Sequence, residues 1–395
     1  MTAVNPDAAP ARTHPSDVLP EDRLLWEFWL NHGLVADALR ERLDALPLGA
    51  NGAYLAGNAL YGGFERKLLD ALSSSAGLDP AVLAAVAEAL APPAAKVTLE
   101  DPEGRLLALL ALWPPPGGDL ARRAREEAVR VSRWWDFARA AGRTNLLAAV
   151  ATGIASAGIE EAVPAPVLGF LQAAAEGIRR RNERLLPFVE KVTRELSGAG
   201  IRHCLLKESA LLREIYPEPR ERLVGDVDLL MPPEDIERTE AVLRALDHRP
   251  FVGIWSSTWY RSHHHHVAPL VNRDAATKVE PHIGIWIPGE SVISIADEIL
   301  ATSRPHRGFE AGRPDATMLC FHLLADLHGG ASAGKLGQAA DLMRLLRAEG
   351  REVDMGRLTA LADRTGCRPY IEDSVAMVAR VFGRDLLDER APGLL

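Results

Sequence analysis

Apolar residues recur at every third or fourth position along most of this chain, which places them on one face of an α-helix. The spacing predicts helices over residues 23–30, 36–45, 80–90, 122–141, 144–157, 166–196, 232–246, 315–328, 336–348 and 357–382. Pro187 falls inside one of them and should kink it or end its first half, because proline lacks the N–H of the helical hydrogen bond. The chain is therefore predicted to be predominantly helical.

Strand-like patterns interrupt the helices in the second half of the chain. Short apolar runs at 203–207, 225–230 and 278–286 are bounded by turn residues, and a short helix is predicted over 210–216. We expect an α+β fold that is predominantly helical, with a small mixed β-sheet between large helical N-terminal and C-terminal regions.

Breaks in these patterns divide the chain into parts. The run from Leu112 to Gly118 contains three prolines and two glycines and is the best linker candidate. The expected parts are a disordered tail over 1–21, a helical N-terminal region over 22–113, a helical region over 119–200 that packs on the core, the sheet-containing core over 201–300, and a helical C-terminal region over 301–395.

Charge and cysteine content narrow the classes of function. The formal net charge of −9 argues against binding of long nucleic acid, which needs a basic face, but it leaves room for a small nucleotide. Three widely spaced cysteines, Cys204, Cys320 and Cys367, indicate reduced thiols and a cytoplasmic protein. The sequence has neither a long apolar run nor a signal-peptide pattern, so no membrane association is expected.

The most informative short motif is Asp226-Val227-Asp228. Side chains alternate along a strand, so both carboxylates point to one face. A divalent cation would relieve their repulsion, because Mg²⁺ prefers hard oxygen ligands. The strand over 278–286 brings Glu280 to a neighbouring position, and three carboxylates could bind two metal ions. Taken alone, an Asp-x-Asp motif is most often a solvated edge strand or a turn.

Several other short motifs flank the two aspartates. They are Leu206-Lys207, Tyr216, Arg222, the histidines 263–266, Glu280-Pro281-His282, His328 and Asp341-Leu342. In order and spacing they resemble the nucleotidyltransferase fold of the DNA polymerase β superfamily, and more closely its bacterial branch of uncharacterised nucleotidyltransferases. The resemblance covers residues 120–346.

The resemblance implies a nucleotidyltransferase core over 201–300 that depends on Mg²⁺ or Mn²⁺. Such an enzyme moves a nucleoside monophosphate from a nucleoside triphosphate, for example ATP, to a hydroxyl of a small molecule, peptide or protein. The implied catalytic and metal-binding residues are Asp226, Asp228 and Glu280. The implied phosphate-binding residues are Lys207, Ser209 and Arg222, and the implied cleft or acceptor contacts are His264, His266, His282, His328 and Asp341.

The residues alone leave structural roles open for some of these side chains. Lys207 and Arg222 could form an ion pair with Glu208 or Glu221, and His282 could be a satisfied histidine packed under the sheet. His328 and Asp341 could equally join two helices by hydrogen bonds.

The turn after the first strand differs from the family pattern. The superfamily places Gly-Ser or Gly-Gly there, because close approach of the backbone to phosphate leaves no room for a Cβ. Here the turn is Lys207-Glu208-Ser209, and the Glu208 carboxylate would repel a triphosphate unless it swings away or pairs with Lys207 or Arg222. Two alternative functions stay open: transfer of a sugar or phosphoryl group from an activated phosphate donor, and a catalytically weak binding or scaffold protein.

Overall fold

The computed structural model describes residues 97–112, 118–218, 221–250, 265–272, 277–285, 295–327 and 335–394. The expected tail, most of the expected region over 22–113, and the predicted site residues His264 and His328 lie outside the described residues. Within the described residues the protein has an α+β fold that is predominantly helical, with one small mixed sheet, as the sequence predicts.

Seven short strands of the described chain form the sheet, in the order β3-β4-β5-β2-β1-β7-β6. They are β1 (Cys204–Leu205), β2 (Val227–Leu230), β3 (Arg249–Pro250), β4 (Leu270–Asn272), β5 (Thr277–His282), β6 (Arg304–Pro305) and β7 (Gly312–Arg313). β2 and β5 are parallel neighbours, whereas β1 runs antiparallel to β2. The last two strands extend the sheet past residue 300, where the apolar pattern predicts only helices.

The helices before the sheet are α6 (Pro102–Ala111), α7 (Gly118–Ala128), α8 (Trp134–Arg143), α9 (Leu147–Ala157) and α10 (Ala165–Gly198). The prediction of one helix over 122–141 is wrong, because the chain breaks between α7 and α8. The buried Glu103 stabilises the break: its Oε1 accepts the N–H groups of Ser132 (3.2 Å) and Arg133 (2.9 Å). Glu103 thus supplies acceptors for N–H groups that the start of a helix leaves unpaired.

The α10 helix has 34 residues and continues through Pro187, so the proline does not end it. Apolar side chains are buried on both sides of the proline, for example Phe170 and Leu171 before it and Val189 and Val192 after it. This burial stabilises both halves despite the hydrogen bond that Pro187 cannot donate. Among the described residues, no helix combines the length and the apolar character needed to cross a membrane.

The remaining helices are α11 (Lys207–Leu211), α12 (Ile236–Ala245), α14 (Ala296–Thr302), α15 (Ala316–Leu327), α16 (Leu336–Glu349), α17 (Met355–Arg364), α18 (Arg368–Phe382) and α19 (Arg384–Arg390). The single helix predicted over 357–382 is also wrong. Gly366 adopts a left-handed conformation (φ 69°) just after α17, and the Cys367 N–H donates back to Ala362 O at 2.8 Å. A glycine in this conformation is a common way to end a helix.

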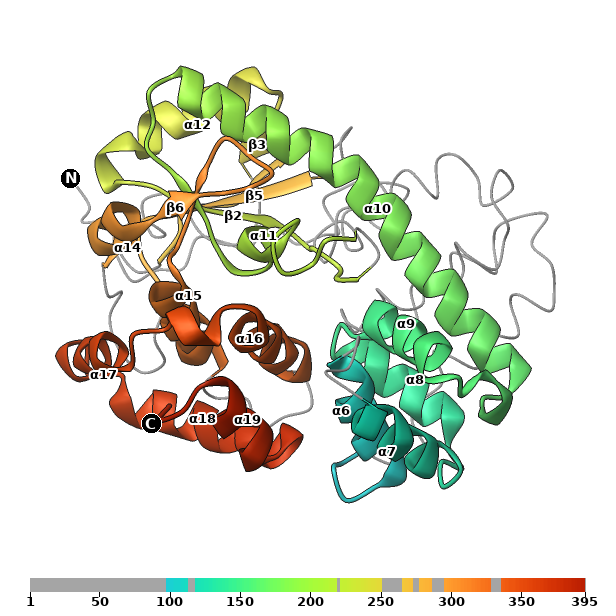
Figure 1. The fold of residues 1–395 in the computed structure, drawn as a ribbon. Helices are drawn as coiled ribbons and strands as arrows, with labels where there is room; N and C mark the ends of the chain where they lie inside the picture. Colours follow the sequence, from blue (N-terminus) through green and yellow to red (C-terminus); the bar gives the residue numbers. More distant parts are fainter. Residues whose placement is uncertain are drawn as a thin grey trace, which may run out of the picture.

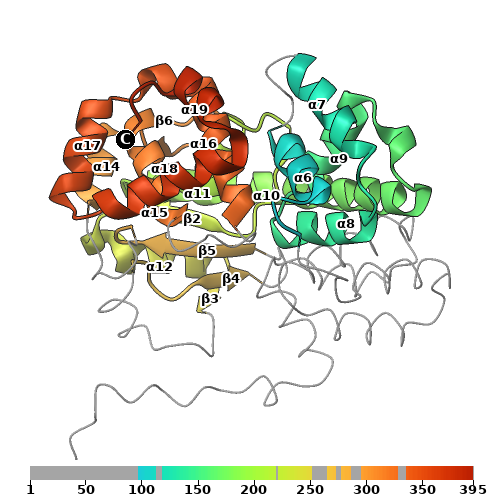
Figure 2. The ribbon, with the colours of Figure 1, turned by 90° about the horizontal axis from the view of Figure 1, so that it is seen from below.

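The sheet lies between two helical layers. Figure 1 shows α12 and the C-terminal half of α10 on one side of the sheet, and α11 with the C-terminal helices on the other. α10 extends beyond the sheet and packs on α8 and α9, so one helix belongs to both halves of the molecule. The helices α6–α9 and the C-terminal helices lie side by side in Figure 2, where α6 contacts α16 and α18.

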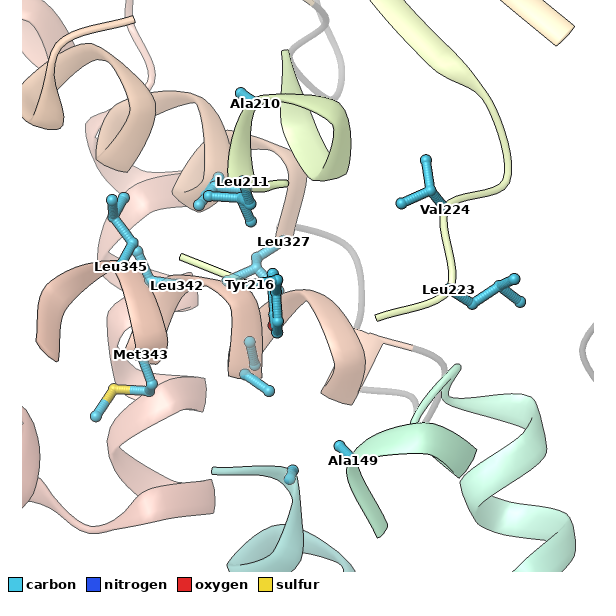
Figure 3. Close-up of a cluster of buried hydrophobic side chains, with 14 of the residues drawn as sticks. Ala149, Ala210, Leu211, Tyr216, Leu223, Val224, Leu327, Leu342, Met343 and Leu345 are labelled. Atoms are coloured by element: carbon cyan, nitrogen blue, oxygen red, sulfur yellow. The ribbon is translucent and has the colours of Figure 1, made fainter. Parts of the chain in front are cut away.

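One hydrophobic core connects these parts. Figure 3 shows a portion of it, with Ala149 of α9, Leu211 of α11, Tyr216, Leu327 of α15 and Leu342 of α16. All five side chains are buried. Because the cluster draws on both helical regions and on the turn next to β1, it packs these parts together.

Candidate active site

The pairing of β2 with β5 brings acidic residues from two distant segments together. Asp228 lies opposite Glu280 in the parallel register, and side chains alternate along each strand. The apolar Val227 and Val279, both fully buried, therefore lie on the opposite face. The charged face consists of Asp226, Asp228, Lys278, Glu280 and His282.

Two lysine ammonium groups lie among the three carboxylates. Lys278 Nζ is 2.8 Å from Asp226 Oδ2 and 2.9 Å from Glu280 Oε1. Lys207 Nζ donates to Asp228 Oδ1 at 3.2 Å. None of the five side chains is more than 26% exposed, so water and salt screen these attractions less than they would at the surface.

Burial and the ammonium groups shift the three carboxyl groups in different directions. Burial raises the pKa of Asp226, and Lys278 offsets only part of this effect. Burial also disfavours the charge of Glu280, but Lys278 lowers the pKa of Glu280 to about 2. For Asp228, Lys207 and a hydrogen bond with His282 outweigh burial and hold the pKa far below its ordinary value. Asp228 and Glu280 are therefore ionised at neutral pH, and Asp226 is the group most readily protonated.

Two histidines border the carboxylates. His282 is fully buried, and its Nε2 lies 2.7 Å from Asp228 Oδ1. His266 Nε2 lies 3.8 Å from Glu280 Oε2, while its Nδ1 is 2.7 Å from the carbonyl oxygen of Val267. The two rings have centroids 5.3 Å apart. The structure thus brings the predicted His266 and His282 to the carboxylates, with His282 as the direct partner of Asp228.

The charged face can hold a divalent metal ion. Asp228, Glu280 and His282 offer ligand atoms that all lie within 4.8 Å of one another. Asp228 Oδ2 is buried and has no hydrogen-bond partner among the described residues, which is an unfavourable state for a carboxylate oxygen. A cation at this position would satisfy it. Two carboxylates suit Mg²⁺ or Mn²⁺, and the imidazole adds a ligand that Mn²⁺ accepts more readily than Mg²⁺.

The turn after β1 forms hydrogen bonds with the backbone of both aspartates. Leu206 N–H donates to Asp228 O at 3.0 Å, and the hydroxyl of the fully buried Ser209 donates to Asp226 O at 3.2 Å. Ser209, which the resemblance assigns to phosphate, thus fixes the backbone next to the aspartates. Lys207 has φ 45°, a left-handed conformation that is uncommon for a residue other than glycine.

Arg222 belongs to a buried ion-pair cluster. Its Nη2 lies 2.6 Å from Glu208 Oε1 and 2.9 Å from Asp341 Oδ2. Tyr216 donates its hydroxyl to Asp341 Oδ1 at 2.5 Å. Arg222 is 4% exposed and Asp341 is 1% exposed, so the guanidinium that the resemblance assigns to phosphate is enclosed by protein. The contacts favour the structural ion pair over a phosphate contact, and Glu208 is one of its members.

One guanidinium in this cluster faces two carboxylates. Asp341 accepts bonds from Arg222 and from Tyr216, whereas Glu208 accepts one from Arg222. Burial raises the pKa of Glu208 to about 7, because the attraction of Arg222 is offset by Asp341 nearby. The raised pKa reduces the negative charge of Glu208 next to the site at neutral pH.

The α10 helix holds the segment before the aspartates. Asn182 Nδ2 donates to Arg222 O at 2.5 Å, and Arg181 Nη2 donates to Gly225 O at 3.1 Å. Both donor residues are buried in α10. The segment has no regular secondary structure, so these side chains supply the donors that a neighbouring strand would otherwise provide.

Three residues near the site are absent from the sequence prediction. Lys278 is one, and His322 and Asp326 of α15 are the others. Asp326 adds to the negative field at Lys207, whose pKa is raised because its acidic neighbours outweigh burial. His322 is buried, which lowers its pKa to about 4, and Lys207 adds to this effect. The sequence signal that could have found His322 and Asp326 is their spacing of four residues, which places both side chains on the same face of one helix.

Comparison with known families decides what kind of protein carries this site. The sequence model of the uncharacterised nucleotidyltransferase family matches residues 131–383. The chain belongs to this family. Residues 131–383 contain all seven described strands and the helix α10, so the charged face lies within the matched range. Comparisons with curated proteins and with solved structures give no match.

Proposed function

We propose that this protein is a Mg²⁺-dependent nucleotidyltransferase of the DNA polymerase β-like superfamily. It transfers a nucleoside monophosphate from a nucleoside triphosphate, such as ATP, to a hydroxyl group of a small molecule, peptide or protein. The observation that carries the proposal is the facing pair Asp228 and Glu280 on parallel strands, with Asp228 Oδ2 buried and without a hydrogen-bond partner in the described part of the chain. The formal net charge of −9 supports a small acceptor over a long nucleic acid.

In this proposal the metal ion is held by Asp228, Glu280 and His282. When bound, it supplies positive charge for the phosphates and for the leaving pyrophosphate. Burial raises the pKa of Asp226, so it is the better proton acceptor for the attacking hydroxyl among the three carboxylates. The buried strands keep these groups in fixed positions, which favours in-line attack.

Lys207 is the cation best placed to bind the triphosphate. Its side chain is 20% exposed, and its ammonium contacts Asp228, so the cation lies at the site. Arg222, by comparison, is enclosed by Glu208 and Asp341. A lysine acts as a mobile point charge that can follow phosphate oxygens during the reaction.

The position of Glu208 supports an active enzyme over a scaffold protein. Its carboxylate pairs with Arg222 at 2.6 Å, and its pKa is raised to about 7 by burial. Both effects reduce the repulsion that a carboxylate next to the phosphates would cause. The absence of the usual glycine in this turn is therefore compatible with nucleotide binding.

The first test is calorimetric titration with non-hydrolysable analogues of ATP, GTP, CTP and UTP, in Mg²⁺ and in chelator. We expect Mg²⁺-dependent binding of at least one analogue by the wild type, and a loss of at least tenfold in affinity in Asp228→Asn, because this variant removes the anionic metal ligand. Asp385→Asn is the matched control, since Asp385 is exposed in the C-terminal helix α19.

A second measurement addresses transfer itself. Mass spectrometry of acceptor mixtures incubated with the preferred triphosphate should show the added mass of a nucleoside monophosphate in the wild type and not in Asp228→Asn. Binding of no analogue, or binding that is equal in Asp228→Asn and in the control, would contradict the proposed function. An added sugar or phosphoryl mass would identify the alternative group transfer.

A further inference from the structure

Lys278 occupies the space between two of the three carboxylates of the site. Its Nζ lies 2.8 Å from Asp226 Oδ2 and 2.9 Å from Glu280 Oε1. Both distances are those of charge-assisted hydrogen bonds. One ammonium group therefore bridges two carboxylates that would otherwise repel each other.

The register of the two strands produces this bridge. Asp228 faces Glu280 across the parallel pair. Lys278 precedes Glu280 by two residues on β5, and Asp226 precedes Asp228 by two residues, so the lysine and the first aspartate meet on the same face. Lys278 extends from within a strand that is hydrogen-bonded on both sides, by β2 and β4, and its backbone is therefore fixed.

The residues that converge on one metal position do not include Asp226. Ligand atoms of Asp228, Glu280 and His282 lie within 4.8 Å of one another, whereas Asp226 Oδ2 points to Lys278. A second ion between Asp226 and Glu280 would lie next to the ammonium group of Lys278, which already binds one oxygen atom of each carboxylate. An ammonium group and a divalent cation repel each other and cannot share this position.

We propose that the ammonium group of Lys278 takes the place of a second divalent cation, so that the site binds one metal ion. This inference rests on the proposed function, and it differs from the two metal ions that three carboxylates suggest in the sequence. The charges of the site also favour one metal ion. The two ammonium groups of Lys207 and Lys278 offset two of the three carboxylate charges, and one divalent cation more than neutralises the charge that is left. Lys278 is a positioning residue that holds the carboxylates of Asp226 and Glu280 next to each other.

The test is the stoichiometry of Mn²⁺ binding to the full chain without nucleotide. The free ion is measured by its electron paramagnetic resonance signal. We expect one equivalent in the wild type and two in Lys278→Met and Lys278→Gln, because both variants free Asp226 and Glu280 for a second ion. Lys191→Met is the matched control, since it removes the same charge from an exposed position on α10 and should bind one equivalent.

The outcomes separate this inference from the proposed function. Two equivalents in the wild type, or one equivalent in both Lys278 variants, would overturn the inference and leave the proposed metal-dependent function intact. No Mn²⁺ binding in the wild type would overturn both. Circular dichroism melts of the four proteins identify a variant that does not fold, and in that case the wild-type stoichiometry alone distinguishes one ion from two.

Discussion

Glu208 and Asp341 share the guanidinium of Arg222, and this sharing gives the site a titratable group near neutral pH. Asp341 accepts bonds from Arg222 and from Tyr216, whereas Glu208 accepts one from Arg222. Burial raises the pKa of Glu208 from its ordinary 4.5 to about 7. The folded state therefore holds a proton on Glu208 more tightly than the unfolded state does.

The raised pKa of Glu208 predicts a pH-dependent loss of stability. Between pH 4.5 and pH 7 the folded protein keeps a proton that the unfolded chain releases, so the free energy of unfolding falls as the pH rises through this window. Above pH 7 the loss is complete and amounts to about 3 kcal/mol. Glu208→Gln cannot titrate, and this part of the pH dependence should disappear in the variant.

Urea unfolding of the wild type and of Glu208→Gln at pH 5 and pH 8 measures this effect. From pH 5 to pH 8, the free energy of unfolding of the wild type should fall relative to that of Glu208→Gln. If the free energy of unfolding changed equally with pH in both proteins, Glu208 would not be the group that binds the proton in the folded state.

Local alternation along a strand is why Asp226 and Asp228 could be placed on one face from the sequence, whereas the position of Glu280 opposite Asp228 depends on the pairing of β2 with β5. Lys278 obeys the same alternation and was open to the same argument, but its position between two carboxylates depends on the register of β2 with β5. The contact of Arg222 with Asp341 spans 119 residues, and no local pattern connects them. The phosphate role predicted for Arg222 stays a prediction, which the enclosed ion pair disfavours.

At the scale of elements, α10 carries the segment that leads into β2. Asn182 is fully buried and donates to the carbonyl oxygen of Arg222. We predict that Asn182→Ala lowers the free energy of unfolding by about 1–3 kcal/mol, because the carbonyl group loses its donor in a buried place. Arg194→Ala, at an exposed position of the same helix, should change it by less than about 0.5 kcal/mol.

Thermal and urea unfolding of the two α10 variants provide the measurement. Equal stability of Asn182→Ala and Arg194→Ala would show that the backbone segment before β2 does not depend on α10. A Mn²⁺ titration of Asn182→Ala adds a second readout, since a displaced segment should also weaken metal binding at Asp228.

The apolar spacing in the sequence indicated where many of the helices lie. Some helix boundaries, however, depend on contacts with residues far away along the chain. The break between α7 and α8 is supported by Glu103, which lies 29 residues before Ser132. The end of α17, by comparison, is a local feature: Gly366 was visible in the sequence as a candidate terminator. The strands β6 and β7 have two residues each, too few for a period of two to be recognised.

At the scale of the whole molecule, Gly337 marks a close approach between the C-terminal helices and the group of helices α6–α9. A Cβ on Gly337 of α16 would lie 2.4 Å from the carbonyl oxygen of Thr144, at the end of α8. We predict that Gly337→Ala destabilises the protein by about 1–3 kcal/mol, because the backbone of one part must move away from the other.

Gly169 provides the opposite case. It lies in α10, and a Cβ there would meet nothing within 4 Å. Gly169→Ala should therefore raise the free energy of unfolding by about 0.5–1 kcal/mol, through the better helix propensity of alanine. Urea unfolding of both variants tests the packing of the two regions, and a stabilising Gly337→Ala would contradict the close approach.

The left-handed backbone of Lys207 limits which residues suit this position. Glycine adopts φ 45° without strain, whereas lysine adopts it only with the support of surrounding contacts. The ion pair of Lys207 with Asp228 is such a contact, and a buried carboxylate that loses its charged partner costs more free energy than the backbone strain. Selection of random variants for heat resistance should therefore retain lysine at residue 207, although glycine fits the backbone better.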